Sequence, residues 1–142
     1  ILYFGSTQVG EGEETGGICF PFGTPVVTDQ GEIPINKINK NNTINNYKVI
    51  KVIKKLNIND YFISIKKNAL GPNIPSQDTL ITREHGIYIN GKLVRAKKLI
   101  NNKNIFKKRT KRLPIYNVLL NKHHKMTVNN MIVETLHPDS IK

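Results

Sequence analysis

The sequence predicts an all-β domain, and three observations support this fold class. Short stretches rich in β-branched and aromatic residues recur along the chain, separated by turn signals such as Asn90-Gly91. Apolar residues at helical spacing are nowhere sustained for long. The 142 residues, of which 38% are hydrophobic and 23% charged, can bury one core and lack the composition of a disordered or membrane-spanning chain.

The first expected elements are a hairpin and two longer strands. Pro25–Thr28 and Glu32–Ile35 flank an Asp29-Gln-Gly31 turn and are expected to pair. Tyr47–Leu56 carries four β-branched apolar residues in its middle, which predicts a largely buried strand. Asp60–Lys66 alternates with a period of two, which predicts a half-buried strand.

The later elements again alternate short strands with turns. A hairpin is expected over Gly86–Val94, because Asn90-Gly91 is a strong two-residue turn signal. A single helical turn is expected over Arg95–Ile100. The remaining expected strands are Leu80–Thr82, Pro114–Leu120, and the pair Lys125–Val128 and Met131–Glu134 around Asn129-Asn130.

Residues 1–18 differ from the rest of the chain. Gly10–Gly17 is acidic, rich in glycine and without periodicity, so residues 1–18 are expected to be a flexible N-terminal flank, either native precursor or residues added for expression. The domain is expected over residues 19–142. The single cysteine, Cys19, excludes an internal disulfide framework, and no signal-peptide pattern is present; together these favour an intracellular location.

The chain is basic, with 22 Lys and Arg against 10 Asp and Glu, a net charge of +12. Its basic residues are concentrated in Lys103–Arg112, which is expected to be a solvated loop, with a polyanion-binding patch as the alternative. Of the basic residues 18 are Lys, and the chain also has 20 Ile and 18 Asn. All three residue types have A/T-rich codons, so coding bias accounts for much of the charge and a nucleic-acid partner is not favoured.

Cys19 lies where the flank meets the first structured segment. Its thiol is one short side chain from the carbonyl of Ile18. Attack on that carbonyl forms a five-membered ring and moves the acyl group from nitrogen to sulfur, which turns an amide into a thioester. The blander interpretation of a lone cysteine is a small buried hydrophobe.

An N-to-S shift at the Ile18–Cys19 bond is uphill and needs assistance. The carbonyl oxygen needs a donor and the leaving nitrogen needs a proton. The hydroxyl of Thr82 and the imidazole of His85, three residues apart at the end of a short strand, supply both kinds of group. No cofactor is expected, and no metal, because adjacent His123 and His124 would point to opposite faces of a strand and a zinc site needs about four converging ligands.

Three segments occur in a specific order. Cys19–Ile35 has an opening cysteine, then Gly-Thr, a strand, a turn and a second strand. Thr82–Leu99 has Thr-x-x-His followed by strand, turn, strand and Ala-x-x-Leu. Ile115–Leu120 and Met126–Glu134 form a hydrophobic strand and a closing hairpin with an asparagine turn. Together these segments resemble the Hint domain, the module shared by inteins and the Hedgehog autoprocessing domain.

The resemblance implies a compact, horseshoe-shaped β fold with pseudo-twofold symmetry. It implies that Cys19 is the nucleophile of an autocatalytic cleavage at the Ile18–Cys19 bond, and that Thr82 and His85 polarise and protonate the scissile amide. The substrate would be the chain's own N-terminal flank, and the acyl acceptor water or an unknown nucleophile. The domain is expected to be monomeric, without a membrane partner, and too short to hold an inserted endonuclease.

The chain departs from the Hint pattern in its third segment. Inteins generally end in His-Asn, whereas Glu134 and Thr135 stand here, and Thr135 cannot cyclise. With His137, these two residues are the candidates for an auxiliary role at the C-terminal end, although a surface histidine is the blander interpretation of His137. Many relatives carry an aspartate where this chain has Asn117. Full splicing is therefore not expected.

Two alternatives to self-cleavage remain open. The domain could keep the Hint fold as a folding or assembly module with weakened chemistry. It could also be a basic nucleic-acid-binding β domain, for which phosphate contacts would give a steep salt dependence of binding.

Overall fold

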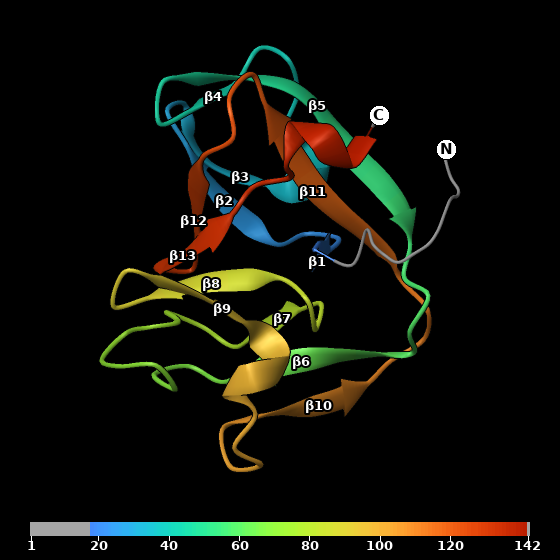
Figure 1. Ribbon diagram of the computed structural model, residues 1–142, viewed down its shortest axis with the longest axis vertical. Coiled ribbons are helices and arrows are strands. Elements are labelled where there is room, and N and C mark those ends of the chain that lie inside the picture. The colour runs from blue at the N-terminus through green and yellow to red at the C-terminus, as the bar shows by residue number, and fades with distance from the viewer. Residues whose placement is uncertain (1–17, 142) are drawn as a thin grey trace.

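The computed structural model describes residues 18–141. Except for Ile18, the flank predicted over residues 1–18 lies outside the described residues. The described chain is an all-β fold interrupted by 3-10 helices, as predicted (Figure 1). No helix in this part of the chain is long and apolar enough to cross a membrane.

Most of the strands are short and follow one another closely. In chain order the elements are β1 (Phe20–Pro21), β2 (Pro25–Thr28), β3 (Gly31–Pro34), η1 (Ile35–Lys37), β4 (Thr43–Ile44), β5 (Tyr47–Leu56), β6 (Tyr61–Ile65), β7 (Thr79–Ile81), β8 (Gly86–Ile89), β9 (Lys92–Arg95), η2 (Ala96–Leu99), β10 (Ile105–Arg109), β11 (Pro114–Leu120), β12 (Lys125–Val128), β13 (Met131–Glu134) and η3 (Pro138–Ile141).

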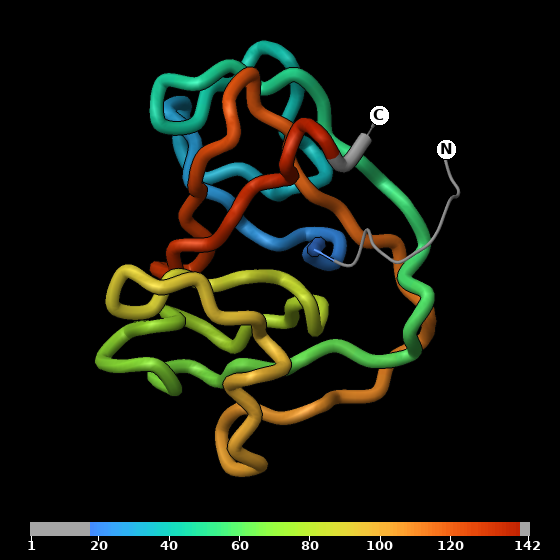
Figure 2. Tube along the Cα trace, in the orientation of Figure 1, coloured from blue at the N-terminus to red at the C-terminus, as the bar shows by residue number. Residues whose placement is uncertain are grey.

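The molecule has a horseshoe shape because the chain passes between its two parts twice, in opposite directions. The chain leaves β5 in the upper part of Figure 1 and enters β6 in the lower part, and it returns from β10 into β11 along the same side (Figures 1 and 2). On this path β11 pairs with β5, and β10 pairs with β6. The two parts also meet through β13 and β8, where Val133 lies opposite Ile87.

The expected pseudo-twofold symmetry is visible in two hairpin units of the same construction. The first hairpin unit consists of β2, β3 and η1, and the second of β8, β9 and η2. In each unit an antiparallel hairpin runs directly into a 3-10 helix whose first residue, Ile35 or Ala96, is buried. The two units are therefore equivalent supports placed in opposite parts of the molecule.

Asparagines form the tight turns. Asn90 has a φ of 52° and Gly91 a φ of 80° between β8 and β9, and Asn129 and Asn130 have φ values of 48° and 67° between β12 and β13. Two successive residues with positive φ are the requirement of a type I′ hairpin turn, whose twist matches that of the strands. Both hairpins therefore form where the sequence predicts them.

The hydrophobic core is continuous across both parts of the molecule. Its buried members include Phe20 from β1, Ile63 and Ile65 from β6, and Met126 and Val133 from the closing hairpin. A second, smaller cluster joins Cys19 to Phe62 and Ile115, with Leu80 and Leu113 packed against it. The predicted nucleophile therefore lies in an apolar pocket of its own.

The burial predicted for two strands is wrong. In β5 only Val49 is buried, and Ile50 and Leu56 are 42% and 58% exposed, because the outer face of this strand is open to solvent. In β6 the four residues from Phe62 to Ile65 are all buried. The strand lies between β10 and β7 in its sheet, and one face joins the main core while Phe62 joins the Cys19 cluster.

The loop predicted over Lys103–Arg112 is also corrected, because Ile105–Arg109 forms β10. This strand pairs antiparallel with β6 from Ile105 opposite Ile65 to Arg109 opposite Tyr61. Its exposed residues are basic, as is common for an edge strand that must not pair with another chain. The short strands β1 and β4 were likewise not predicted, since two residues carry no periodicity.

Candidate active site around the Ile18–Cys19 peptide bond

Cys19 is held at the start of β1 by strand pairing and packing. Phe20 lies opposite Tyr116 and Pro21 opposite Ile115, so β11 fixes the backbone immediately after the cysteine. The Cys19 side chain is 2% exposed and packs with Phe62 and Ile115. A thiol in these surroundings is positioned by neighbours on all sides.

Thr82 contacts the backbone of Cys19, 63 positions earlier in the chain. Its hydroxyl accepts the Cys19 N–H at 2.8 Å and donates to the Cys19 carbonyl at 3.0 Å. The Thr82 N–H also donates to the Cys19 carbonyl, at 3.1 Å. Thr82 thus contacts the nitrogen of the Ile18–Cys19 amide directly, and its hydroxyl donates to the carbonyl of the next peptide bond and not to that of Ile18.

His85 is brought to the same place by the turn that follows Thr82. Its N–H donates to the Thr82 carbonyl at 3.2 Å, and its ring centroid lies 4.6 Å from that of Phe20. His85 Nε2 lies 2.8 Å from the carbonyl oxygen of Glu134. A carbonyl only accepts hydrogen bonds, so Nε2 carries the proton and Nδ1 carries the lone pair in the neutral ring.

Among the described residues, the buried Nδ1 of His85 has no hydrogen-bond partner. Buried polar atoms are nearly always paired, so an unpaired one in a candidate site points to a group that takes up or releases a proton. The Cys19 backbone lies close enough to affect the pKa of His85, without forming a hydrogen bond of normal geometry to Nδ1.

Burial favours the neutral forms of the Cys19 thiol and the His85 imidazole. It raises the pKa of the Cys19 thiol to about 12, and the positive charge of Lys55 acts in the opposite direction. It lowers the pKa of His85 to about 4, against the raising effect of the Glu134 and Cys19 backbone. Near neutral pH the site therefore contains a thiol and an uncharged imidazole.

Two further residues act near the scissile bond: Asn117, which the sequence analysis noted only as a departure from the aspartate of many relatives, and Lys55, which it did not single out. Asn117, in the middle of β11, donates from Nδ2 to the carbonyl oxygen of Ile18, and its Oδ1 accepts the Val118 N–H at 2.7 Å. Lys55 is the cation that acts on Cys19. Asn117 is 99 positions from Ile18, so only the pairing of β11 with β1 and β5 shows that these side chains meet.

The C-terminal candidates lie in different places. Glu134 is at the site, because its carbonyl accepts from His85 and its Oε2 accepts the Gly86 N–H at 2.8 Å. Thr135 is fully buried, and its hydroxyl donates to the His124 carbonyl at 2.7 Å. His137 is exposed, with its ring 4.8 Å from that of His123. Among the contacts of the described residues, Glu134 is the one C-terminal candidate that reaches His85.

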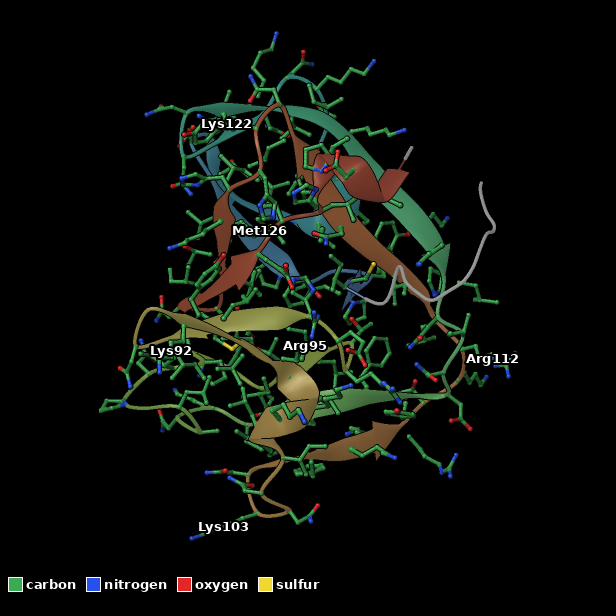
Figure 3. The ribbon with its side chains drawn as sticks, in the orientation of Figure 1. Lys92, Arg95, Lys103, Arg112, Lys122 and Met126 are labelled. Carbon is green, nitrogen blue, oxygen red and sulfur yellow. The ribbon has the colours of Figure 1, made fainter. Side chains whose placement is uncertain are left out.

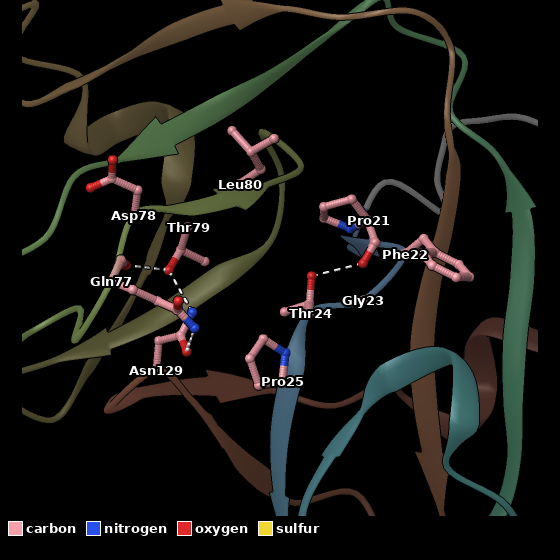
Figure 4. Close-up of a pocket in the computed structure, with 10 residues that line it drawn as sticks. All are labelled: Pro21, Phe22, Gly23, Thr24, Pro25, Gln77, Asp78, Thr79, Leu80 and Asn129. Carbon is pink, nitrogen blue, oxygen red and sulfur yellow. Dashed lines mark hydrogen bonds between the residues drawn. The ribbon is translucent and has the colours of Figure 1, made fainter.

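A shallow hollow of about 270 Å³ lies beside the site (Figure 4). The loop after Cys19 forms one wall, where the Thr24 hydroxyl donates to the Pro21 carbonyl at 2.7 Å. Leu80 lines the other side and also packs against the Cys19 cluster. Leu80 is thus shared between the hollow and the Cys19 cluster.

The described residues contain no group of three or more His, Cys, Asp or Glu side chains able to hold a metal ion. The basic side chains labelled in Figure 3 lie on separate sides of the molecule, with Lys103 at the bottom, Arg112 at the right and Lys122 at the top.

Comparison with known proteins gives consistent results. A family model described as a Hint domain matches residues 18–140. The fold resembles the solution structure of a bacterial intein-like domain from Clostridium thermocellum, with 15% identity, a TM-score of 0.67 and coverage of 83% of this chain and 99% of that chain. It also resembles a DnaB intein from Synechocystis sp. PCC 6803, with 15% identity, a TM-score of 0.58 and coverage of 83% and 98%.

None of the curated proteins compared with the chain matches it significantly. Both solved structures are only 15% identical to this chain, so they show a similarity of fold and nothing more. The family model spans nearly all of the described residues and begins one position before Cys19. The chain therefore belongs to the Hint domain family.

Proposed function

We propose that this Hint domain cleaves its own chain at the Ile18–Cys19 bond through a thioester. The observation that carries the proposal is the set of hydrogen bonds between Thr82 and the Cys19 backbone, with His85 fixed beside it. Thr82, 63 positions along the chain, and His85, three residues further on, bring a hydroxyl and an imidazole to one particular amide, and these are the kinds of group that assist an acyl shift.

The reaction begins with attack of Cys19 Sγ on the carbonyl carbon of Ile18. The thiol proton passes to the lone pair of His85 Nδ1, and the C–S bond forms. The tetrahedral intermediate then collapses, the C–N bond breaks, and the imidazolium returns the proton to the Cys19 nitrogen. The products are a thioester at Ile18 and a free amine on Cys19, with no external proton gained or lost.

Three neighbouring residues assist these reaction steps. The Thr82 hydroxyl holds the Cys19 N–H, so the amide cannot rotate away from the thiol. The Glu134 carbonyl holds the proton of His85 on Nε2, so Nδ1 is the atom that exchanges protons. Lys55 favours the transient thiolate that burial disfavours.

The proposal is confined to the N-terminal bond. Thr135 has no side-chain amide with which to cyclise, and its hydroxyl is already bonded to the His124 backbone. The thioester is expected to end by reaction with water or with another nucleophile. The hollow beside Leu80 is the proposed direction of approach, because Leu80 lines it and also packs against the Cys19 cluster.

The experiment is to incubate the purified 142-residue chain with hydroxylamine or dithiothreitol and to follow its mass. Loss of the 18-residue flank is expected, with hydroxamate or thioester formation on the released fragment. Cys19→Ala removes the sulfur from a small buried side chain and should remain intact. An intact mass of the unaltered chain under all conditions would contradict the proposal and favour a non-enzymatic assembly module.

A further inference from the structure

We infer that Asn117 is a catalytic residue of this reaction, as the donor that holds the oxyanion formed on the Ile18 carbonyl. The inference rests on the proposed cleavage at Ile18–Cys19 and adds a residue to its machinery. It starts from a contact with a reacting atom, because Asn117 Nδ2 already donates to the carbonyl oxygen that Cys19 would attack.

The orientation of the Asn117 amide is fixed by its second hydrogen bond. Oδ1 accepts the Val118 N–H at 2.7 Å, so the NH₂ group occupies the other position and points at Ile18. The side chain is fully buried, and Asn117 lies opposite Ile53 in the middle of the β5–β11 pairing. A donor on a rigid strand needs no reorganisation when charge develops on the oxygen.

The other groups of the site leave this task open. Thr82 Oγ1 accepts the Cys19 N–H and donates to the Cys19 carbonyl, which belongs to the next peptide bond. His85 Nε2 faces the Glu134 carbonyl. Among the hydrogen bonds described for residues 18–141, the donor to the Ile18 carbonyl is Asn117.

The chemical step assigned to Asn117 is electrostatic. As the C–S bond forms, the π electrons of the Ile18 carbonyl move to its oxygen, and the Nδ2–H group donates to the resulting negative charge. The charge returns to the carbonyl when the C–N bond breaks. Asn117 gains and loses no atom, and its effect is to lower the barrier to forming the tetrahedral intermediate.

An aspartate at position 117, the residue that many relatives carry, would act differently here. A carboxylate keeps an acceptor for the Val118 N–H but presents a second oxygen, without a proton, to the Ile18 carbonyl. Only the protonated acid could donate there. Asn117→Asp therefore replaces the donor group with an oxygen and keeps nearly the same side-chain shape. A change in rate then reports the loss of the donor and not a change in packing.

The test compares Asn117→Asp with the unaltered chain in excess hydroxylamine, by mass spectrometry. Loss of one oxyanion donor is expected to slow cleavage at pH 8 by about 10²- to 10³-fold. As the pH is lowered toward 5 the ratio of the two rates should shrink, because burial favours the neutral acid, which can donate. Asn117→Leu, without a donor in any state, should stay slow throughout.

Asn57→Asp is the matched control. Asn57 is buried, its Oδ1 accepts the Asn59 N–H at 3.0 Å and its Nδ2 donates to the Tyr61 carbonyl at 3.3 Å, so it has the same two kinds of bond away from Cys19. Its substitution should lower thermal stability and leave the cleavage rate of the folded protein unchanged. Equal rate losses in both Asp variants, or an unchanged rate in Asn117→Asp, would overturn the inference.

A measurement without substitution of Asn117 covers the case in which its variants do not fold. In isotope-labelled Cys19→Ala, which keeps the intact bond, a through-hydrogen-bond coupling between Asn117 Nδ2 and the Ile18 carbonyl carbon is expected, and its absence would count against the inference. Failure of the proposed function is recognised separately, since the unaltered chain would then show no cleavage at all.

Discussion

The two hairpin units have the same construction, but the residues that lead into them differ. Cys19 precedes the first unit, and Thr82 and His85 precede the second. In the loop between β1 and β2, Phe22 is 67% exposed and there is space around Gly23, whereas His85 before β8 and Gly86 at its start are buried. One repeated support thus follows a segment that is exposed at Phe22 on one side, and a segment whose Thr82 and His85 side chains are buried on the other.

The difference teaches that symmetry of fold does not require symmetry of chemistry. In each unit the hairpin and 3-10 helix fix the position of the segment in front of them, and the side chains in that segment decide what it does. The proposed reaction needs one nucleophile and one proton carrier at a single bond. Two equivalent supports that face each other can provide both.

The largest effect is expected from His85→Ala, which removes the proton carrier supplied by the second unit. Cleavage in hydroxylamine should slow by at least about 10²-fold, the usual contribution of a general acid–base group. His123→Ala, at an exposed position whose ring lies against His137, should cleave at the normal rate. Equal slowing in both variants would remove His85 from the mechanism and leave the second unit as a support only.

The pH dependence should distinguish the contributions of the two units. Because the pKa of Cys19 is about 12 and that of His85 about 4, both groups stay neutral at rest near neutral pH. Transfer of the proton from the thiol to the imidazole gives a thiolate and an imidazolium, and the total number of bound protons does not change. The unaltered chain should therefore cleave at a constant rate between about pH 6 and 9 when hydroxylamine is saturating.

In His85→Ala only the thiolate remains to be formed. Because the raised pKa of Cys19 lies above this range, the thiolate fraction and the rate should increase about tenfold per pH unit. Initial rates followed by mass at several pH values check both profiles. A rate that rises steeply with pH in the unaltered chain would show that the two groups do not exchange a proton directly.

Gly86→Ala is expected to disturb the second unit at the start of β8. A Cβ at Gly86 would come within 2.4 Å of Leu93 Cδ1 and 2.7 Å of Glu134 Oε2, which holds the Gly86 N–H. We expect a loss of about 1–3 kcal/mol in the free energy of unfolding and slower cleavage, since Glu134 also fixes His85. Thermal unfolding and the cleavage rate well below the midpoint measure the two effects.

Gly23→Ala is the corresponding change in front of the first unit. Gly23 has a φ of 84° and nothing within 4 Å of an added Cβ, so the strain is confined to its own backbone and costs roughly 1–2 kcal/mol. Its cleavage rate should stay normal once the protein is folded. If Gly23→Ala slowed cleavage as much as Gly86→Ala, the proposed contrast between an exposed and a buried segment would be wrong.

The smallest effect is expected from Lys55→Met, which removes the cation that favours the Cys19 thiolate. The side chain is only partly buried, so screening limits the expected slowing to roughly two- to fivefold, and added salt should slow the unaltered chain in the same direction. Lys51→Met, at an exposed position of the same strand, is the control. Identical rates in both variants would mean that Lys55 does not act on the thiol.

The residues predicted correctly as neighbours were those in short, ordered motifs. Thr82 and His85 lie three residues apart, so one turn brings both to the same bond, and Cys19 is adjacent to Ile18 by covalent structure. The type I′ turns at Asn90-Gly91 and Asn129-Asn130 were also predictable, because positive φ is a property of the residues themselves. These features depend on local geometry.

What could not be predicted depends on which strands pair. Asn117 meets Ile18 and Lys55 affects Cys19 only because β11 lies between β1 and β5. The burial of Phe62 and Ser64 depends on the neighbours of β6 and not on its alternating pattern. The consecutive basic residues of β10 predict a solvated loop, but an exposed edge strand can carry them equally well.

The sequence separations within the site link its chemistry to the time course of folding. Cys19 and Thr82 are 63 positions apart, Ile18 and Asn117 are 99 apart, and His85 and Glu134 are 49 apart. Contacts between distant residues form slowly, because long loops must close before any interaction offsets the lost entropy. Of the groups at the site, the Ile18–Cys19 bond is synthesised first and the Glu134 carbonyl last, so folding would delay the proposed cleavage until all of these groups have come together.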